Sequence, residues 1–216
     1  MKLKTIFSLL ILVGILSFST KEKTRQVALK NSVVAITEAQ RAYAVAELQR
    51  TKNLLEKELK GLNDEQLKFK PAPDKWSIAE VVEHIALAEN GIFQITQATL
   101  KAPADSLKRK EIKVTEADIK QRLTNRTTKV QSPEIIKPTG QFPSATAAYQ
   151  AFTNRREATI QYISTTNDDL LNHFWQHPAT GTIDLYQTIL LIAAHSERHI
   201  LQIIEVKSDG NFPSGN

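Results

Sequence analysis

The chain contains no cysteine among its 216 residues, so disulfide bonds, thiolate metal ligands and a cysteine nucleophile are all excluded. Glycine is scarce, with seven residues, which argues against an all-β or loop-rich fold. Aromatic residues make up only 6% of the chain. The long periodic segments are instead rich in alanine, leucine, isoleucine, lysine, glutamate and glutamine, most of which favour helices.

A concentrated basic surface is also lacking. The formal net charge is +5, but the excess lysine and arginine is scattered and is not interleaved with aromatic residues. Nucleic-acid binding usually requires such a stripe, so no nucleic-acid partner is expected.

The first twenty residues have the pattern of a secretory signal. Lys2 and Lys4 precede an apolar run from residue 6 to 18, and the small residues Ser17 and Ser19 fit a cleavage site near residue 19 or 20. The run is short for a membrane span, so stable membrane insertion after cleavage is not expected. We predict a signal peptide over residues 1–20 and export to the periplasm or the extracellular space; a short uncleaved anchor is the alternative.

Four long helical segments follow a polar lead-in, which spans residues 21–32 and is expected to be flexible. The helices are predicted over residues 33–62, 76–100, 145–165 and 184–206, with a disordered tail at 207–216. Capping boxes mark two of the starts, Ser77 with Glu80 and Asp184 with Gln187. The pattern predicts an all-α fold, a four-helix bundle over residues 33–206.

Residues 102–143 form a long crossover between the second and third helices. A short helix is expected from Thr115 to near Val130, and the segment could form a rim or lid over a pocket. Residues 63–75 and 166–182 are expected to be loops, and no strand pattern stands out. Arg156 falls on or near the apolar stripe of the third helix and is expected to extend outward to solvent.

Two histidines on the fourth helix, His195 and His199, are four residues apart and therefore share one face. A third, His84, lies at the edge of the apolar stripe of the second helix. Three imidazoles with an open position make a metal site of the catalytic type, whereas packed histidines bonded to neighbours are the alternative. If they bind one ion, their nitrogens must lie about 3–3.5 Å apart, as ligands near 2.1 Å from the ion require.

Other polar residues near these histidines have weaker signals. Glu80 and Gln202, each one turn from a histidine, are candidates for orienting the ligands from behind. Glu83 and Glu197 are expected to face solvent. A second pair, His173 and His177, lies in a polar segment next to Pro178, so a continuous helix that would align the two is doubtful.

Three motifs resemble those of DinB-like proteins, the superfamily that also contains the YfiT-like metal-dependent hydrolases. They are the segment from Lys75 to Glu89, the segment from Ala194 to Ile203 and the lead-in Leu67 to Pro71, and the resemblance extends over about residues 35–206. It implies a four-helix bundle that holds a divalent metal, often zinc or nickel, through His84, His195 and His199.

The resemblance also implies a small-molecule substrate and either thiol-transferase or hydrolase chemistry. Some members resemble S-transferases, others are isomerases, and the crossover of this chain matches no particular group. The alternatives are a helical bundle that binds a metal or small ligand without catalysis, and a structural bundle with packed histidines. Helical bundles often pair, so a homodimer is compatible with the sequence.

Overall fold

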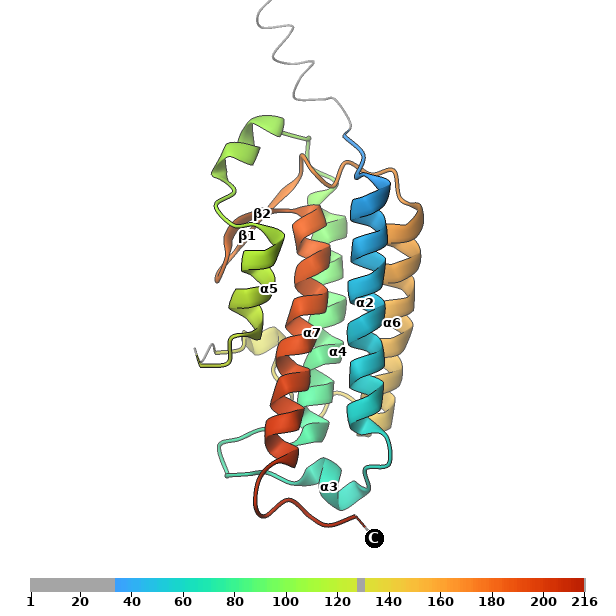
Figure 1. The fold of residues 1–216 in the computed structure, drawn as a ribbon, viewed down its shortest axis with the longest axis vertical. Coiled ribbons are helices and arrows are strands. Elements are labelled where there is room, and N and C mark those ends of the chain that lie inside the picture. The colour runs from blue at the N-terminus through green and yellow to red at the C-terminus, as the bar shows by residue number, and fades with distance from the viewer. Residues whose placement is uncertain (1–33, 128–130, 216) are drawn as a thin grey trace, which may run out of the picture.

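Four long helices lie side by side in the computed structural model, which describes residues 34–127 and 131–215 (Figure 1). They are α2 (Glu38–Leu59), α4 (Ile78–Thr99), α6 (Ala145–Thr165) and α7 (Leu185–Lys207). Packing contacts join α4 to α6 and α7, and α2 to the same two helices, which closes the bundle. The predicted four-helix bundle is therefore confirmed. No helix in the described ranges combines the length and apolarity needed to span a bilayer.

Side-chain caps fix where the helices begin. The predicted capping boxes of Ser77 with Glu80 and Asp184 with Gln187 are both present. The first helix begins at Glu38, later than the predicted residue 33, because Thr37 and Gln40 form another capping box. The predicted signal peptide and lead-in over residues 1–32 lie outside the described residues.

The C-terminal end of α2 shows why the chain turns after this helix. Gly61 has a φ of +80°, a left-handed conformation that glycine adopts at low cost, directly after the helix. The segment predicted to be a loop then contains a short helix, α3 (Asp64–Lys68), which the side chains of Asn63 and Gln66 cap.

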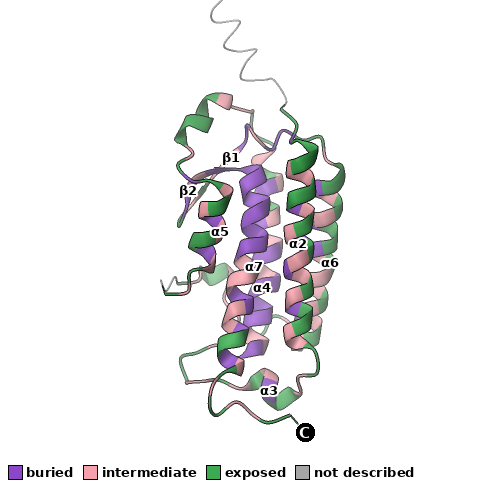
Figure 2. Cartoon of the chain, in the orientation of Figure 1, coloured by how far each residue is buried: buried purple, intermediate pink, exposed green. Residues whose placement is uncertain are grey.

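Helix α7 is the most buried element of the bundle (Figure 2). All of its residues from 185 to 194 are buried, although a bundle helix normally exposes one face. The crossover supplies the extra cover, because its helix α5 (Glu116–Thr124) packs against α7. The crossover also contains the 3₁₀ helices η1 (Ser106–Glu111) and η2 (Glu134–Ile136). Helix α5 ends at Thr124, earlier than the predicted residue 130.

A two-stranded antiparallel hairpin corrects the prediction that no strands form. Strand β1 (Phe174–His177) pairs with β2 (Gly181–Asp184), with Trp175 opposite Ile183. Gly181, with a φ of +79°, begins the return strand. Strands of four residues are too short to show a periodic pattern, which is why the segment resembles a loop in the sequence.

The C-terminal tail also differs from expectation, because residues 208–215 pack against the bundle. The ring of Phe212 meets that of Phe69 edge to face at a centroid distance of 5.5 Å. The amide of Gln66 donates a hydrogen bond to the Pro213 carbonyl at 3.0 Å. The tail was expected to be disordered for its glycine, proline and serine content, but one aromatic side chain gives it an apolar contact.

Candidate metal centre

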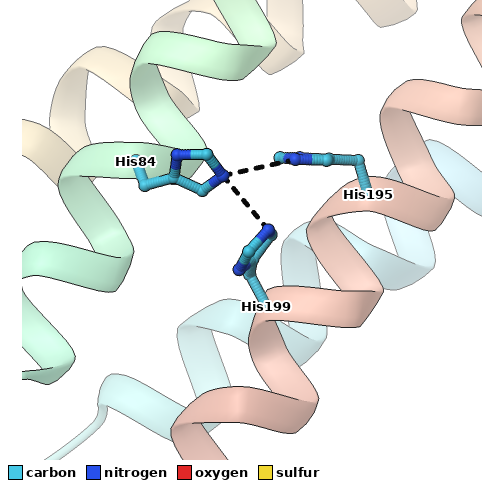
Figure 3. Close-up of side chains that lie close together, drawn as sticks. All are labelled: His84, His195 and His199. Atoms are coloured by element: carbon cyan, nitrogen blue, oxygen red, sulfur yellow. Dashed lines mark hydrogen bonds between the residues drawn. The ribbon is translucent and has the colours of Figure 1, made fainter. Parts of the chain in front are cut away.

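The three histidines singled out from the sequence meet between α4 and α7 (Figure 3). Nε2 of His84 lies 3.3 Å from Nε2 of His195 and 3.1 Å from Nε2 of His199. These separations fall within the range expected for nitrogens that surround one ion at about 2.1 Å. These three side chains form what we call the histidine cluster, in which His84 is separated from the other two by more than one hundred residues in the sequence.

Burial keeps these imidazoles neutral. His84 and His199 are buried, and His195 is partly exposed. Burial lowers the pKa of His84, although its hydrogen bond to a backbone carbonyl opposes the shift. Burial, together with the neighbouring imidazoles, holds the pKa values of His195 and His199 well below the ordinary value. Neutral imidazole is the form that binds a metal, so the lone pairs are available at neutral pH.

Hydrogen bonds on the far side of two rings determine where their protons are. Nδ1 of His84 lies 2.7 Å from the carbonyl oxygen of Ile136, and Nδ1 of His199 lies 2.9 Å from Oε1 of Gln202. Both oxygens are acceptors, so each Nδ1 carries a hydrogen and each Nε2 presents a lone pair. Two lone pairs facing each other at 3.1 Å cannot form a hydrogen bond. A cation between them satisfies both, so the residues fit a metal.

The aromatic ring of Trp76 borders the histidine cluster. The Trp76 ring lies 4.9 Å from the His84 ring and 6.3 Å from the His199 ring, measured between centroids. The sequence indicates Trp76 only as a residue packed against the first helical turn, because its contact with His199 depends on how α4 and α7 face each other. Trp76 thus places an apolar surface beside the rings of His84 and His199.

Glu80 does not hold a histidine. Its Oε2 accepts the backbone N–H of Ser77 at 2.7 Å, and its Oε1 accepts a hydrogen bond from Lys70, also at 2.7 Å. Both oxygens therefore serve the helix cap and a surface ion pair. The orienting group behind His84 is the carbonyl of Ile136, which no side-chain pattern in the sequence could reveal.

Glu83 is buried, contrary to the expectation that it faces solvent. Its carboxylate accepts hydrogen bonds from the backbone N–H groups of Thr139, Gly140 and Gln141 at 3.1, 3.2 and 2.8 Å. The crossover supplies these groups, so Glu83 gains partners that its own helix cannot provide. Glu197 is also paired, with Arg50 at 2.5 Å.

Arg156 is fully buried, and the expectation that it extends outward is wrong. It forms an ion pair with Glu89, with both N···O distances 2.7 Å. Its other hydrogen bonds reach the Leu48 carbonyl, Thr51 Oγ1 and Ser196 Oγ. We call this group the arginine cluster. Its signal in the sequence is that Arg156 and Glu89 both occupy positions on apolar stripes.

The second histidine pair does not form a site. His173 places its ring nitrogens 2.7 Å from the Asp169 carbonyl and 2.9 Å from the Ala102 carbonyl. His177 lies at the end of β1, where its Nδ1 contacts Thr180 Oγ1 at 3.1 Å. Within the described residues, the histidine cluster is the group whose geometry suits a metal ion.

The family model of the DinB superfamily matches residues 47–203. This chain belongs to the DinB superfamily. It is 29% identical to uncharacterized protein YuaE of Bacillus subtilis (strain 168) over 151 residues, which cover 69% of this chain and 88% of YuaE. The matched residues include all three histidines of the cluster and both charged residues of the arginine cluster.

A solved structure supports the fold. YfiT from Bacillus subtilis, described as a probable metal-dependent hydrolase with an unusual four-helix bundle topology, superposes with a TM-score of 0.51. The match covers 80% of this chain and 89% of YfiT, at 16% sequence identity. The DinB-superfamily chain described here thus shares a bundle architecture with YfiT.

Proposed function

We propose that this protein is a metal-dependent hydrolase that binds one divalent ion through His84, His195 and His199. The observation that carries the proposal is the convergence of their Nε2 atoms, with Nδ1 of His84 and His199 each bonded to an oxygen acceptor. The description of YfiT as a probable metal-dependent hydrolase gives further support.

The three imidazoles would hold the ion through nitrogen alone. Bound there, a divalent ion supplies Lewis acidity and a coordination position that the protein leaves free for a small molecule or water. The Ile136 carbonyl and Gln202 hold the rings of His84 and His199 in the orientation that binding requires. The Trp76 ring packs beside the His84 ring and adds an apolar surface next to it.

The choice of metal and the location of the protein are parts of the same proposal. All-nitrogen ligation by imidazoles suits zinc or nickel better than magnesium or calcium, which prefer oxygen. We propose export on the basis of the basic start and apolar run in residues 1–20. Comparing the mass of the mature protein with that of the full chain tests whether the leader is removed.

The direct test is metal analysis of the purified protein beside its histidine variants. Wild type, reconstituted with zinc or nickel, should retain about one ion per chain. His84→Ala and His199→Ala should each weaken binding by more than about 100-fold, since losing even an outer partner costs 10–100-fold. His177→Ala removes a histidine outside the cluster and should bind as wild type does.

Two results would contradict the metal site: wild type that retains no stoichiometric ion, or ligand variants that retain as much as His177→Ala.

If the ion binds as expected, the metal-loaded protein should be assayed on ester and amide substrates and on thiol transfer to an electrophile. Hydrolysis that disappears in His84→Ala supports the proposed reaction. Thiol transfer alone would replace it, and inactivity in every assay would favour a binding protein.

A further inference from the structure

The segment of the crossover that touches α4 spans residues 134–141, and we call it the strap. Its hydrogen bonds to α4 involve two consecutive residues, Glu83 and His84. The Ile136 carbonyl accepts the hydrogen bond of His84 Nδ1, and the backbone of residues 139–141 donates to Glu83. One segment is therefore bound both to a residue of the histidine cluster and to the carboxylate beside it.

The contact with Glu83 is the stronger of the two anchors. The buried carboxylate accepts three backbone hydrogen bonds, and bonds to an ionised acceptor are about twice as strong as neutral ones. Gly140 has a φ of +78°, which turns successive N–H groups toward a single anion. The strap depends on a charge supplied by α4.

The contact with His84 is weaker but has a chemical consequence. The Ile136 carbonyl lies only three residues before Thr139, with Lys137 and Pro138 between them. Proline restricts the backbone, so the position of residues 139–141 is transmitted to residue 136. If the strap shifts, His84 loses the acceptor that keeps the hydrogen on Nδ1 and the lone pair on Nε2.

We infer that Glu83 is a positioning residue of the histidine cluster, acting on His84 through the strap. The inference rests on the proposed function where it concerns metal affinity, but the tautomer of His84 can be measured without any metal. Glu83 fixes the strap, the strap carbonyl fixes the tautomer, and the tautomer directs Nε2 toward His195 and His199.

The test uses the full chain with Glu83→Gln. The amide retains the size of the side chain, but its NH₂ group faces an N–H donor of the strap, so the three hydrogen bonds cannot all persist. In the metal-free protein, ¹⁵N NMR of the imidazoles should show His84 as a single Nδ1–H tautomer in wild type and as a mixture in Glu83→Gln. Zinc affinity should fall about tenfold, the lower end for loss of an outer-shell contact.

Gly140→Ala tests the same link from the side of the strap. A Cβ at this position meets no atom within 4 Å, so the substitution strains the backbone without touching α4. It should shift the His84 tautomer in the same direction as Glu83→Gln, by less. It also keeps the test valid if Glu83→Gln fails to fold.

Glu197→Gln is the matched control, because it removes a carboxylate two residues from both His195 and His199 whose partners are surface cations. It should leave the tautomer of His84 unchanged. The inference is overturned if both Glu83→Gln and Gly140→Ala keep the wild-type tautomer and affinity, or if Glu197→Gln alters the tautomer equally. A wild type with a fixed tautomer but no bound zinc would refute the proposed metal site alone.

Discussion

The histidine cluster and the arginine cluster are both polar groups inside one bundle, and both include residues of α4 and α7. In the arginine cluster every N–H of the Arg156 guanidinium has an acceptor, and the charge is balanced by Glu89. In the histidine cluster, His84 and His199 turn lone pairs toward each other. The first group is complete within the protein, whereas a cation would satisfy the facing lone pairs of the second.

The difference shows how a buried polar group can indicate its role. A buried cluster in which every donor has an acceptor needs no ligand, so a structural role is enough to account for it. Two acceptors that face each other, as Nε2 of His84 and His199 do, need a partner that neither ring supplies. The two clusters should therefore respond in opposite ways to substitution and to metal.

The largest effect is expected in the arginine cluster. Arg156→Met should lower the free energy of unfolding by about 3–5 kcal/mol, because Glu89 would remain buried without its counter-charge. Adding Glu89→Leu should restore most of the loss. Arg50→Met, which breaks two partly exposed ion pairs, with Glu47 and Glu197, should cost no more than about 2 kcal/mol. Denaturant unfolding measures all four proteins, and an Arg156→Met loss no larger than that of Arg50→Met would refute the contrast.

Zinc should stabilise the protein only through the histidine cluster. At a free zinc concentration 100 times the dissociation constant, wild type should gain about 2.7 kcal/mol. His199→Leu should gain no stability from zinc. Without metal, however, this variant should be about as stable as wild type, because the substitution removes one of two lone pairs that repel each other. Thermal unfolding with and without zinc compares the two. A metal-free variant that is severely destabilised would show that His199 has a structural role.

Asp184 lies between these two extremes, because it is a buried carboxylate that is paired less completely than Glu89 in the arginine cluster. Burial raises its pKa to about 6, although the Gln187 N–H and the half-exposed Arg109 oppose the shift. A raised carboxyl pKa favours the folded state at low pH, so this contribution is lost as pH rises from about 4 through 6. Relative to Asp184→Asn, which keeps a good cap, wild type should lose about 2 kcal/mol between pH 4 and 7.

The measurement is the difference between the two pH–stability curves, which cancels the titration of all other groups. Parallel curves would show that Asp184 is charged at no cost in the folded protein. Asp184→Ala, which removes the cap as well, separates the loss of the hydrogen bond from the loss of charge.

The smallest effect tests whether the two clusters are independent. Ser196 accepts a hydrogen bond from Arg156 and lies between His195 and His199 in the sequence. Ser196→Ala should cost about 1–2 kcal/mol of stability, the value of one hydrogen bond to a charged group, and change zinc affinity by less than about twofold. A larger change in affinity would mean that the arginine cluster also positions the histidines. Calorimetric zinc titration decides between these outcomes.

Much of the bundle could be predicted from local chemistry. Ser77, Asp184 and Ser144 mark helix starts with their own side chains, and Gly61 marks an end, so these boundaries need no tertiary information. The meeting of His84 with His195 could be proposed because apolar stripes indicate which faces of the helices point inward.

The rest depends on contacts between distant segments. Arg156 occupies a stripe position, but a long side chain there can either extend to solvent or find a buried partner, and only the position of Glu89 decides. Glu83 is buried because the crossover returns to α4, and a segment with three proline residues between 132 and 143 gives no periodic signal of its path. The hairpin is missed because its strands are short.

The separation of His84 from His195 by 111 residues has a consequence for biosynthesis. On the ribosome, α4 is made long before α7, and no early segment of the chain carries two members of the histidine cluster. A metal therefore cannot nucleate this fold as it does in a zinc finger, where neighbouring ligands and the ion assemble together. The three-histidine site is complete only after the last helix has joined the others, so full coordination of the proposed ion would be a late event in the life of the chain.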